Sequence, residues 1–318
     1  NAPVLAVSAK TGDGIENLKQ ALGETAGKIP DRKNESVARL PIDRSFTVRG
    51  FGAVVTGTLV AGEIAAGSEM ELLPAGKKVK VRGLQTHGKT VDAARAGQRT
   101  AINLGGVDHA EIERGMVLSE ADALRPTQNF DAEIEVLASA KKNLKSRQRV
   151  RVHLGAIEAL ARVQVLNDRG EIAPGEKDFA QLRLETPVAA VPGERFIVRS
   201  YSPQITVAGG RVADAHAARY YRKDTARTRR FLQGLADAEA TGDKTKTVRL
   251  FLETAGGESG LSFGDLRART GWRDSVLRKA LDANLEKKSI VETSANFYLA
   301  RTPFENLKEK TLLEIQAH

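Results

Sequence analysis

The stretch that decides the fold is LPIDRSFTVRGFGAVVTGT, residues 40–58. Residues 46–48 (FTV) and 53–56 (AVVT) are rich in β-branched side chains, and Gly50 and Gly52 stand between them. This pattern predicts two strands joined by a tight turn. Similar short strand patterns, such as residues 78–81 (KVKV), recur with glycine or proline punctuation from residue 38 to about residue 125. They favour a small antiparallel barrel over a helical domain.

The same strand character continues to residue 216, where residues 131–137 and 149–154 alternate between apolar and polar side chains. After residue 217 the period becomes helical, at 217–238, 244–255, 262–269 and 273–287, and a short hairpin pattern follows at 289–300. Three helices followed by a hairpin are typical of a winged helix, a helix-turn-helix variant. The sequence therefore predicts a mainly β chain with a C-terminal α+β part, consisting of two antiparallel β-barrels and then a winged helix.

The first residues differ from the rest. An apolar run at 4–7 (VLAV) predicts one strand, and Ile15, Leu18 and Leu22 repeat at helical spacing. One strand and one helix cannot bury a core, so we expect residues 1–34 to be the end of a domain whose body lies elsewhere, followed by a linker. The predicted domains are then 35–125 and 126–216 for the barrels and 217–318 for the winged-helix region, with the start of a second winged helix.

Composition narrows the range of functions. The 318 residues carry a net charge of +9 and no cysteine, which excludes thiolate metal sites and disulfides. No apolar run approaches the length of a membrane span. The five histidines lack metal-ligand spacing, so we expect no metal site.

Basic residues form two local clusters. The first cluster consists of Lys141, Lys142, Lys145, Arg147, Arg149 and Arg151, and the second includes Arg219, Arg222 and Lys223. Such clusters suit the phosphate backbone of a nucleic acid, although a solvated basic surface would have the same composition.

Two strings in the first barrel carry a family resemblance. Residues 40–58 resemble the opening of the second domain of translational GTPases, which have Pro-Ile-Asp, then Phe, then Gly-x-Gly-x-Val-Val-Thr-Gly. Residues 101–106 (AINLGG) and 111–118 (EIERGMVL) follow in the order of that domain. Within this class the chain resembles the bacterial selenocysteine-specific elongation factor. Asp43-Arg44 stands where elongation factor Tu has an acidic pair, and residues 81–85 (VRGLQ) and 199–210 (RSYSPQITVAGG) are similar to strings of the selenocysteine factor.

The resemblance implies a site for the aminoacyl group. A selenol is ionised at neutral pH and a serine hydroxyl is not, so Arg44 and Arg82 in a shared pocket, oriented by Asp43, would read that charge. The alternative is that Asp43 and Arg44 form an ordinary surface ion pair. The tripeptide Ser8-Ala9-Lys10 resembles a guanine-recognition motif, but the sequence has no phosphate-binding loop. GTP and Mg²⁺ are therefore implied for the full-length parent, a GTPase, and not for this chain alone.

The implied partners are selenocysteinyl-tRNA, held partly by the first basic cluster, and the ribosome. We expect the second cluster to link the barrel to the C-terminal arm or to contact ribosomal or transfer RNA. In the family a messenger RNA hairpin binds distal winged helices, which we expect to be absent here. We expect a cytoplasmic protein with no membrane partner. Two alternatives stay open: another translational GTPase, of the elongation factor Tu or initiation factor 2 gamma type, and a DNA-binding regulator that uses its winged helix.

Overall fold

The computed structural model describes residues 3–28, 34–50, 52–219, 224–256, 259–294 and 296–317. The chain divides into two compact units, Asn1–Asn34 and Glu35–His318. In the first unit, helix α1 (Ile15–Lys28) has no buried residue. The strand predicted at 4–7 is not formed: the segment is irregular, and Val4 is 97% exposed. A strand needs a hydrogen-bonded neighbour, and the described residues of this unit supply none.

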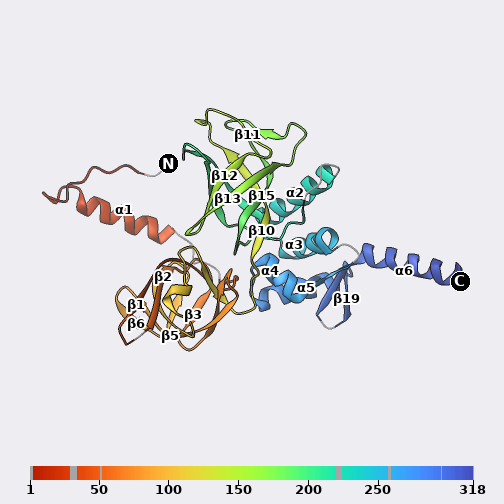
Figure 1. Ribbon diagram of the computed structural model, residues 1–318, viewed down its shortest axis with the longest axis horizontal. Helices are drawn as coiled ribbons and strands as arrows, with labels where there is room; N and C mark the ends of the chain where they lie inside the picture. The colour runs from red at the N-terminus through yellow and green to blue at the C-terminus, as the bar shows by residue number, and fades with distance from the viewer. Residues whose placement is uncertain are drawn as a thin grey trace. The chain divides into compact units, whose positions relative to one another are not determined.

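The second unit begins with the first predicted barrel (Figure 1). Its sheet order is β4-β9-β1-β2-β8-β5-β6, and pairing of β4 with β5 closes six strands into a barrel. The strands are β1 (Arg39–Val48), β2 (Gly52–Thr58), β4 (Glu69–Leu73), β5 (Lys77–Thr86), β6 (Lys89–Val91), β8 (Arg99–Gly105) and β9 (Val117–Glu120), with β3 (Glu63–Ala65) and β7 (Ala93–Arg95) pairing at the side. Alternate residues of these strands, such as Leu40, Val55 and Ile102, fill the core.

The second barrel is closed in the order β10-β15-β13-β12-β16-β17. Its strands are β10 (Thr127–Val136), β12 (Arg149–Leu154), β13 (Ile157–Val165), β15 (Lys177–Val188), β16 (Arg195–Ser200) and β17 (Thr206–Asp214), with β11 (Leu144–Lys145) and β14 (Glu171–Ile172) forming a separate small ladder. Phe130 and Phe196 meet edge to face in the core, with ring centroids 5.5 Å apart. Gly210 must lack a side chain, because a Cβ there would lie 2.6 Å from the Phe196 ring.

The C-terminal part has the winged-helix order, preceded by one additional helix. The elements are α2 (Thr225–Thr241), α3 (Lys244–Phe251) with a π-helical turn (Leu252–Gly256), β18 (Leu261–Ser262), α4 (Phe263–Thr270), α5 (Asp274–Glu286), β19 (Ile290–Ser294), β20 (Phe297–Ala300) and α6 (Arg301–Ala317). Ser262 caps α4, and Gly271 ends it in the left-handed conformation. The predicted fold class is thus confirmed, with β18 as an unpredicted third strand of the sheet β18-β20-β19.

Helix α4 ties the winged helix to both barrels. Arg267 pairs with Glu120 of β9 at 2.9 Å, and Arg269 pairs with Asp214 of β17 at the same distance. The Val37 N–H, just before β1, donates to the carbonyl of Gly271 at 3.0 Å. These contacts leave Glu35–His318 as one unit, so the domain boundaries at 125/126 and 216/217 stay predictions.

Candidate functional site

Asp43 lies in a β-bulge on the outer wall of the first barrel. In the β1–β2 ladder Ile42 pairs with Gly57 and Arg44 pairs with Thr56, so Asp43 is the extra residue between them. Bulges re-aim side chains and are over-represented beside active sites. The hydroxyl of Thr56 donates to Asp43 Oδ1 at 3.0 Å. The strand geometry therefore turns this carboxylate towards the neighbouring strand β2.

The partner of Asp43 is Arg99, the first residue of β8, which sequence reasoning did not identify. Its two Nη atoms donate to the two carboxylate oxygens, Nη2 to Oδ1 at 2.9 Å. This bond is the main cause that lowers the pKa of Asp43, against burial, which acts to raise it. The nearby charge of Arg44 also lowers that pKa. Asp43 is therefore held ionised between two guanidinium groups, and the group of three carries a net charge of +1.

Arg44 and Phe46 extend this group along the outer face of β1. Both side chains are exposed, Phe46 to 41%, which is unusual for a large aromatic residue on a strand. Residues two apart on a strand share a face, so the apolar ring of Phe46 lies on the same face as Arg44. Arg44 forms no ion pair with any residue that the structure describes. A small ligand here would meet an apolar wall, an orienting carboxylate and two cations.

The structure places Arg82 apart from this group. It lies on β5, and β1 and β5 stand opposite each other in the closed order of six strands. Arg82 lines two hollows, of about 480 and 400 Å³, and neither includes Asp43 or Arg44. The nearest β1 residue in those hollows is Thr47, about 13 Å further along the strand than Asp43. The predicted trio of Asp43, Arg44 and Arg82 is not brought together, because strand order sets Arg99 and not Arg82 beside Asp43.

The first basic cluster lies on the second barrel, where acids from other strands neutralise half of it. Lys145 pairs with Glu171 at 3.2 Å, Arg149 pairs with Glu185 at 2.6 Å, and Arg151 pairs with Glu158. In the part of the chain that the structure describes, Lys141, Lys142 and Arg147 have no ion pair. The cluster is therefore less positive than its sequence indicates.

A tyrosine interleaves with the arginines of this cluster. The guanidinium carbons of Arg149 and Arg151 lie 4.7 and 5.3 Å from the ring centroid of Tyr201, a side chain that is 43% exposed. Cations over an aromatic face are attracted by its quadrupole and are held in place by it. This surface offers two ordered guanidinium groups and an accessible ring edge.

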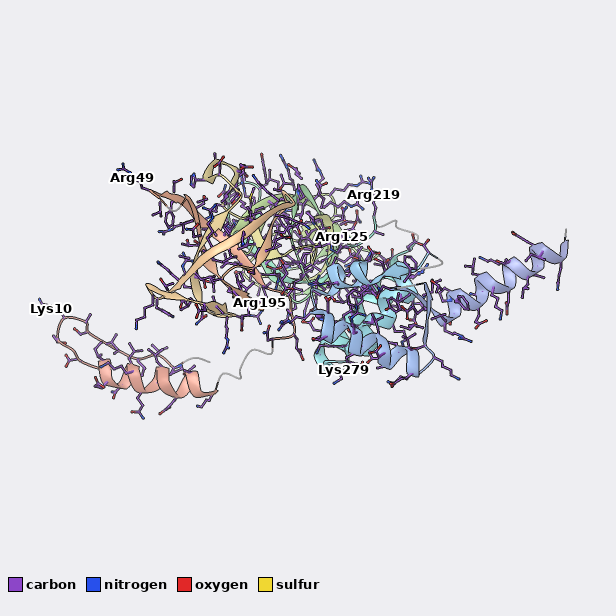
Figure 2. The ribbon with its side chains drawn as sticks, turned by 90° about the horizontal axis from the view of Figure 1, so that it is seen from below. Lys10, Arg49, Arg125, Arg195, Arg219 and Lys279 are labelled. Atoms are coloured by element: carbon purple, nitrogen blue, oxygen red, sulfur yellow. The ribbon has the colours of Figure 1, made fainter. Side chains whose placement is uncertain are left out.

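The two basic clusters meet at one hollow. A depression of about 720 Å³ is lined by Arg147 from the first cluster and Arg219 from the second, together with Arg169, Arg183 and one acid, Asp168. Arg169 is neutralised by Glu176 at 2.6 Å, whereas Arg147 and Arg219 form no ion pair with the described residues. Figure 2 shows Arg219 and Lys279 well apart, so Arg219 does not lie beside this residue of α5. Arg222 and Lys223 lie outside the described residues.

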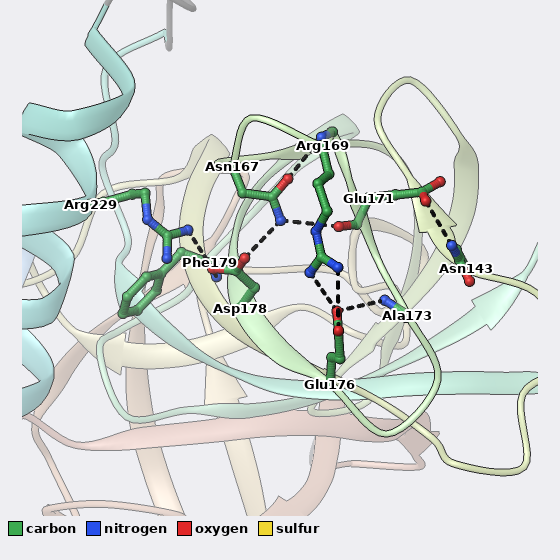
Figure 3. A network of polar contacts seen from close by, with 10 residues as sticks. Asn143, Asn167, Arg169, Glu171, Ala173, Glu176, Asp178, Phe179 and Arg229 are labelled. Carbon is green, nitrogen blue, oxygen red and sulfur yellow. Dashed lines mark hydrogen bonds and ion pairs between the residues drawn. The ribbon is translucent and has the colours of Figure 1, made fainter.

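A polar network makes the wall of this hollow rigid (Figure 3). Asn167 donates to Asp178 Oδ2 at 2.7 Å and to the carbonyl of Glu171 at 3.0 Å. From α2, Arg229 donates to the carbonyl of Leu166 at 2.8 Å and also pairs with Asp178. The network fixes the loop after β13 and anchors α2 to the second barrel.

Ser8, Ala9 and Lys10 form a hydrogen-bonded turn in the first unit. The Ser8 N–H donates to the carbonyl of Asp13 at 3.0 Å, and Lys10 is exposed. Among the described residues no group of three or more acidic or histidine side chains is arranged to hold a metal ion. None of the described helices is both long and apolar enough to cross a membrane.

Helix α5, the third helix of the winged helix, does not present a basic surface. The exposed charged residues of α5 are Asp274, Arg278, Lys279, Asp282 and Glu286. Three acids against two bases disfavour insertion of this helix into the groove of a polyanion, and Arg278 also lies over the Phe263 ring. This arrangement gives no support to a DNA-binding regulator.

Comparison with known proteins gives two family matches. The profile described as elongation factor Tu domain 2 matches residues 52–119, and the profile described as selenocysteine-specific elongation factor, beta-barrel domain, matches residues 131–219. The paired barrels therefore belong to a translation factor of the elongation factor Tu class.

Individual relatives narrow this class. The chain is 41% identical over 284 residues to the selenocysteine-specific elongation factor of Desulfomicrobium baculatum, covering 88% of this chain and 43% of the relative. The corresponding factor of Escherichia coli strain K12 is 33% identical over 66% of this chain and 32% of its own length. The crystal structure of bacterial selenocysteine-specific elongation factor EF-Sec has a TM-score of 0.75, at 23% identity, over 99% of this chain and 49% of that one. The chain belongs to the selenocysteine-specific elongation factor family, and it spans less than half the length of these relatives.

Proposed function

We propose that this chain is the tRNA-holding portion of a translation elongation factor that binds selenocysteinyl-tRNA and delivers it to the ribosome, in the cytoplasm. In this proposal GTP and Mg²⁺ act through a domain of which Ser8, Ala9 and Lys10 form the guanine-side end. The phosphate-binding loop that such a domain needs is not among the 318 residues. Messenger hairpin binding would belong to further winged helices. Family membership supports the role in selenocysteinyl-tRNA delivery. The surfaces of the two barrels support the proposed contacts with the aminoacyl group and the tRNA.

The observation that carries the proposal is the bidentate Asp43–Arg99 pair beside Arg44. A selenolate is anionic, so it gains charge-assisted hydrogen bonds from the two guanidinium groups. A serine hydroxyl in the same place is neutral and gives the remaining N–H donors of Arg44 and Arg99 no second anion beside Asp43, which weakens binding. Asp43 holds Arg99 in one orientation, so little ordering is needed when the ligand arrives. In this proposal Arg99 takes the role that the sequence suggested for Arg82.

The second barrel would hold the body of the tRNA. Arg147 and Arg219 line one hollow, and neither forms an ion pair with the described residues. The guanidinium groups of Arg149 and Arg151 are held over the ring of Tyr201. An RNA duplex is recognised through phosphates and 2′-hydroxyls, which suits guanidinium groups in fixed positions. These contacts would be to the RNA backbone and not to the aminoacyl group, so they should be equally strong for the selenocysteinyl and seryl forms of one tRNA.

The test compares two aminoacyl forms of the same tRNA. Arg99→Ala and Arg44→Ala are expected to weaken binding of the selenocysteinyl form at least tenfold, given about 1.5–3 kcal/mol for each charged hydrogen bond. Binding of the seryl form should change little. Arg95→Ala is the matched control, because Arg95 lies on the same barrel and pairs with Glu63 instead. Equal losses for both aminoacyl forms would overturn the proposed reading of charge.

A further inference from the structure

Arg82 is held in a defined place although it has no acidic partner. The β5–β8 ladder pairs Val81 with Leu104 and Gly83 with Asn103, so Arg82 is the extra residue of a second β-bulge. Such a bulge aims a side chain away from the regular ladder. Among the described residues Arg82 has neither an ion pair nor a side-chain hydrogen bond.

A glycine makes room for this arginine. A Cβ at Gly105 would lie 2.5 Å from Arg82 Nε, 3.2 Å from Cζ and 3.3 Å from Nη2. Gly105 does not have a positive φ, so backbone conformation does not require a glycine there. The reason for a glycine is space: the guanidinium group lies directly against the backbone of β8. Bulge and glycine together give Arg82 a preset position, with its Nη donors open to a ligand.

Some of the basic residues around Arg82 are paired with acidic residues, and others are not. Lys77 is paired with Glu111, and Lys78 is paired with Asp122 at 2.8 Å. The hollow of about 480 Å³ beside Gly105 and Gly106 contains Lys78, Lys80 and Arg82 against one acid, Glu69. With Lys78 neutralised by Asp122, the remaining charged side chains, Lys80, Arg82 and Glu69, sum to +1. A hollow with this charge and an oriented guanidinium fork matches the planar, bidentate geometry of a phosphate oxyanion.

We infer that Arg82, together with Lys80, binds a phosphate group of an RNA backbone at this hollow, on the wall of the first barrel opposite Asp43. The choice of RNA rests on the proposed function, since phosphate alone is what the hollow recognises. This site is separate from the aminoacyl group, because β1 and β5 are opposite strands of the barrel. It would add a second contact with RNA that is independent of the charge-reading arginines.

The test measures how binding of a short RNA duplex depends on salt. Each phosphate contact contributes about one to the slope of log affinity against log salt concentration. Arg82→Ala is expected to weaken binding about tenfold and to lower the slope by about one. Gly105→Ala should give the same loss while removing no charge, because its Cβ displaces the guanidinium. Gly83→Ala is the matched control, since a Cβ there meets nothing within 4 Å. Arg95→Ala controls for net charge on the same barrel.

Each outcome decides one point. Losses in Arg82→Ala and Gly105→Ala, with neither control affected, would support the site. If Arg95→Ala weakens RNA binding as much as Arg82→Ala does, or if Gly105→Ala does not weaken it, the inference that an oriented Arg82 guanidinium group binds the phosphate is wrong. If the parent chain binds the duplex and Arg82→Ala does not weaken it, only this inference fails. If the parent chain binds no RNA, the proposed function fails with it. Titration with inorganic phosphate distinguishes an RNA phosphate from free phosphate as the ligand. If phosphate binds tightly and this binding depends on Arg82, while Arg82→Ala leaves RNA affinity unchanged, the ligand is free phosphate and not RNA.

Discussion

Replacing Asp131 by asparagine is expected to change the stability of the protein little near pH 4 and to stabilise it increasingly as the pH rises to 8. Asp131 on β10 and Asp214 on β17 are direct cross-strand partners, and their exposed fractions are only 4% and 2%. Arg269 Nη1 donates to both oxygens of Asp214, each at 2.9 Å. Among the described residues, Asp131 accepts a hydrogen bond from the Gln181 amide at 3.0 Å, and the charges of Arg269 and Arg183 lower its pKa from nearby. Two buried carboxylates at directly paired strand positions still cannot both ionise without a penalty, because each charge raises the pKa of the other group.

Burial, followed by the charge of Asp214, raises the pKa of Asp131 from its ordinary value of 3.8 to about 7. The folded protein therefore keeps this proton up to a higher pH than the unfolded chain does. Stability is lost as pH rises from about 4 to about 7 and the loss is complete above that range. Since a tenfold change in proton affinity is worth about 1.4 kcal/mol, the loss has a ceiling of roughly 4 kcal/mol. Asparagine is neutral at every pH and removes this loss.

The assay is urea unfolding of parent and variant at a series of pH values from 5 to 8, followed by circular dichroism. The quantity of interest is the difference in unfolding free energy between the two proteins. His216, beside Asp214, has a pKa lowered by burial, and its stability effect runs in the opposite direction with pH. Taking the difference cancels that effect. Asp214→Asn is the control: it removes the charge that pairs with Arg269 and one of the two acceptor oxygens, and it should destabilise at both ends of the series. A parent–variant difference that does not change with pH would refute the reasoning.

Three further predictions follow from single contacts. Phe130→Ala removes a fully buried ring from the second barrel and should lower the unfolding free energy by about 3–5 kcal/mol, measured by denaturant titration. Thr56→Val removes a hydrogen bond to Asp43 and should raise the pKa of that carboxyl, as followed by NMR; no upward change would show that the hydroxyl does not bond it. Glu185→Gln frees Arg149 from its ion pair and should strengthen RNA binding most at low salt, whereas weaker binding would contradict the assigned surface.

Much of the fold could be predicted because each element repeats its pattern over several residues. Alternation in β10 and β12 and helical spacing in α5 were long enough to read. The strand β18 was missed because Leu261–Ser262 is two residues long, too short for any period. The strand predicted at 4–7 shows the opposite error. An apolar run marks a strand only where a neighbouring strand exists to pair with it, and periodicity carries no information about neighbours.

Only part of the candidate site could be predicted from the sequence, for the same reason. Asp43 and Arg44 are adjacent in the sequence and could be singled out there. Arg99 is 56 residues away from Asp43, and only the pairing of β2 with β8, which sets Thr58 opposite Arg99, brings the two together. If the register of β2 and β8 were known in advance, Arg99 could be identified as the partner of Asp43. Arg82 was misplaced for the same reason, since a matching string fixes a residue's strand but not the residues on the opposite wall.

Cross-strand register also decides what the net charge of +9 means for RNA binding. Basic residues that follow one another in the sequence acquire acids from other strands, as Arg149 does from Glu185 and Lys145 from Glu171. A count of basic residues therefore overestimates the phosphates that the surface can neutralise, because a paired arginine must first give up its acid. Those without an ion pair in the described part of the chain, such as Arg147 and Arg219, stand beside glycine-lined or loop-lined hollows. The salt dependence of RNA binding should accordingly follow these few positions rather than the total charge.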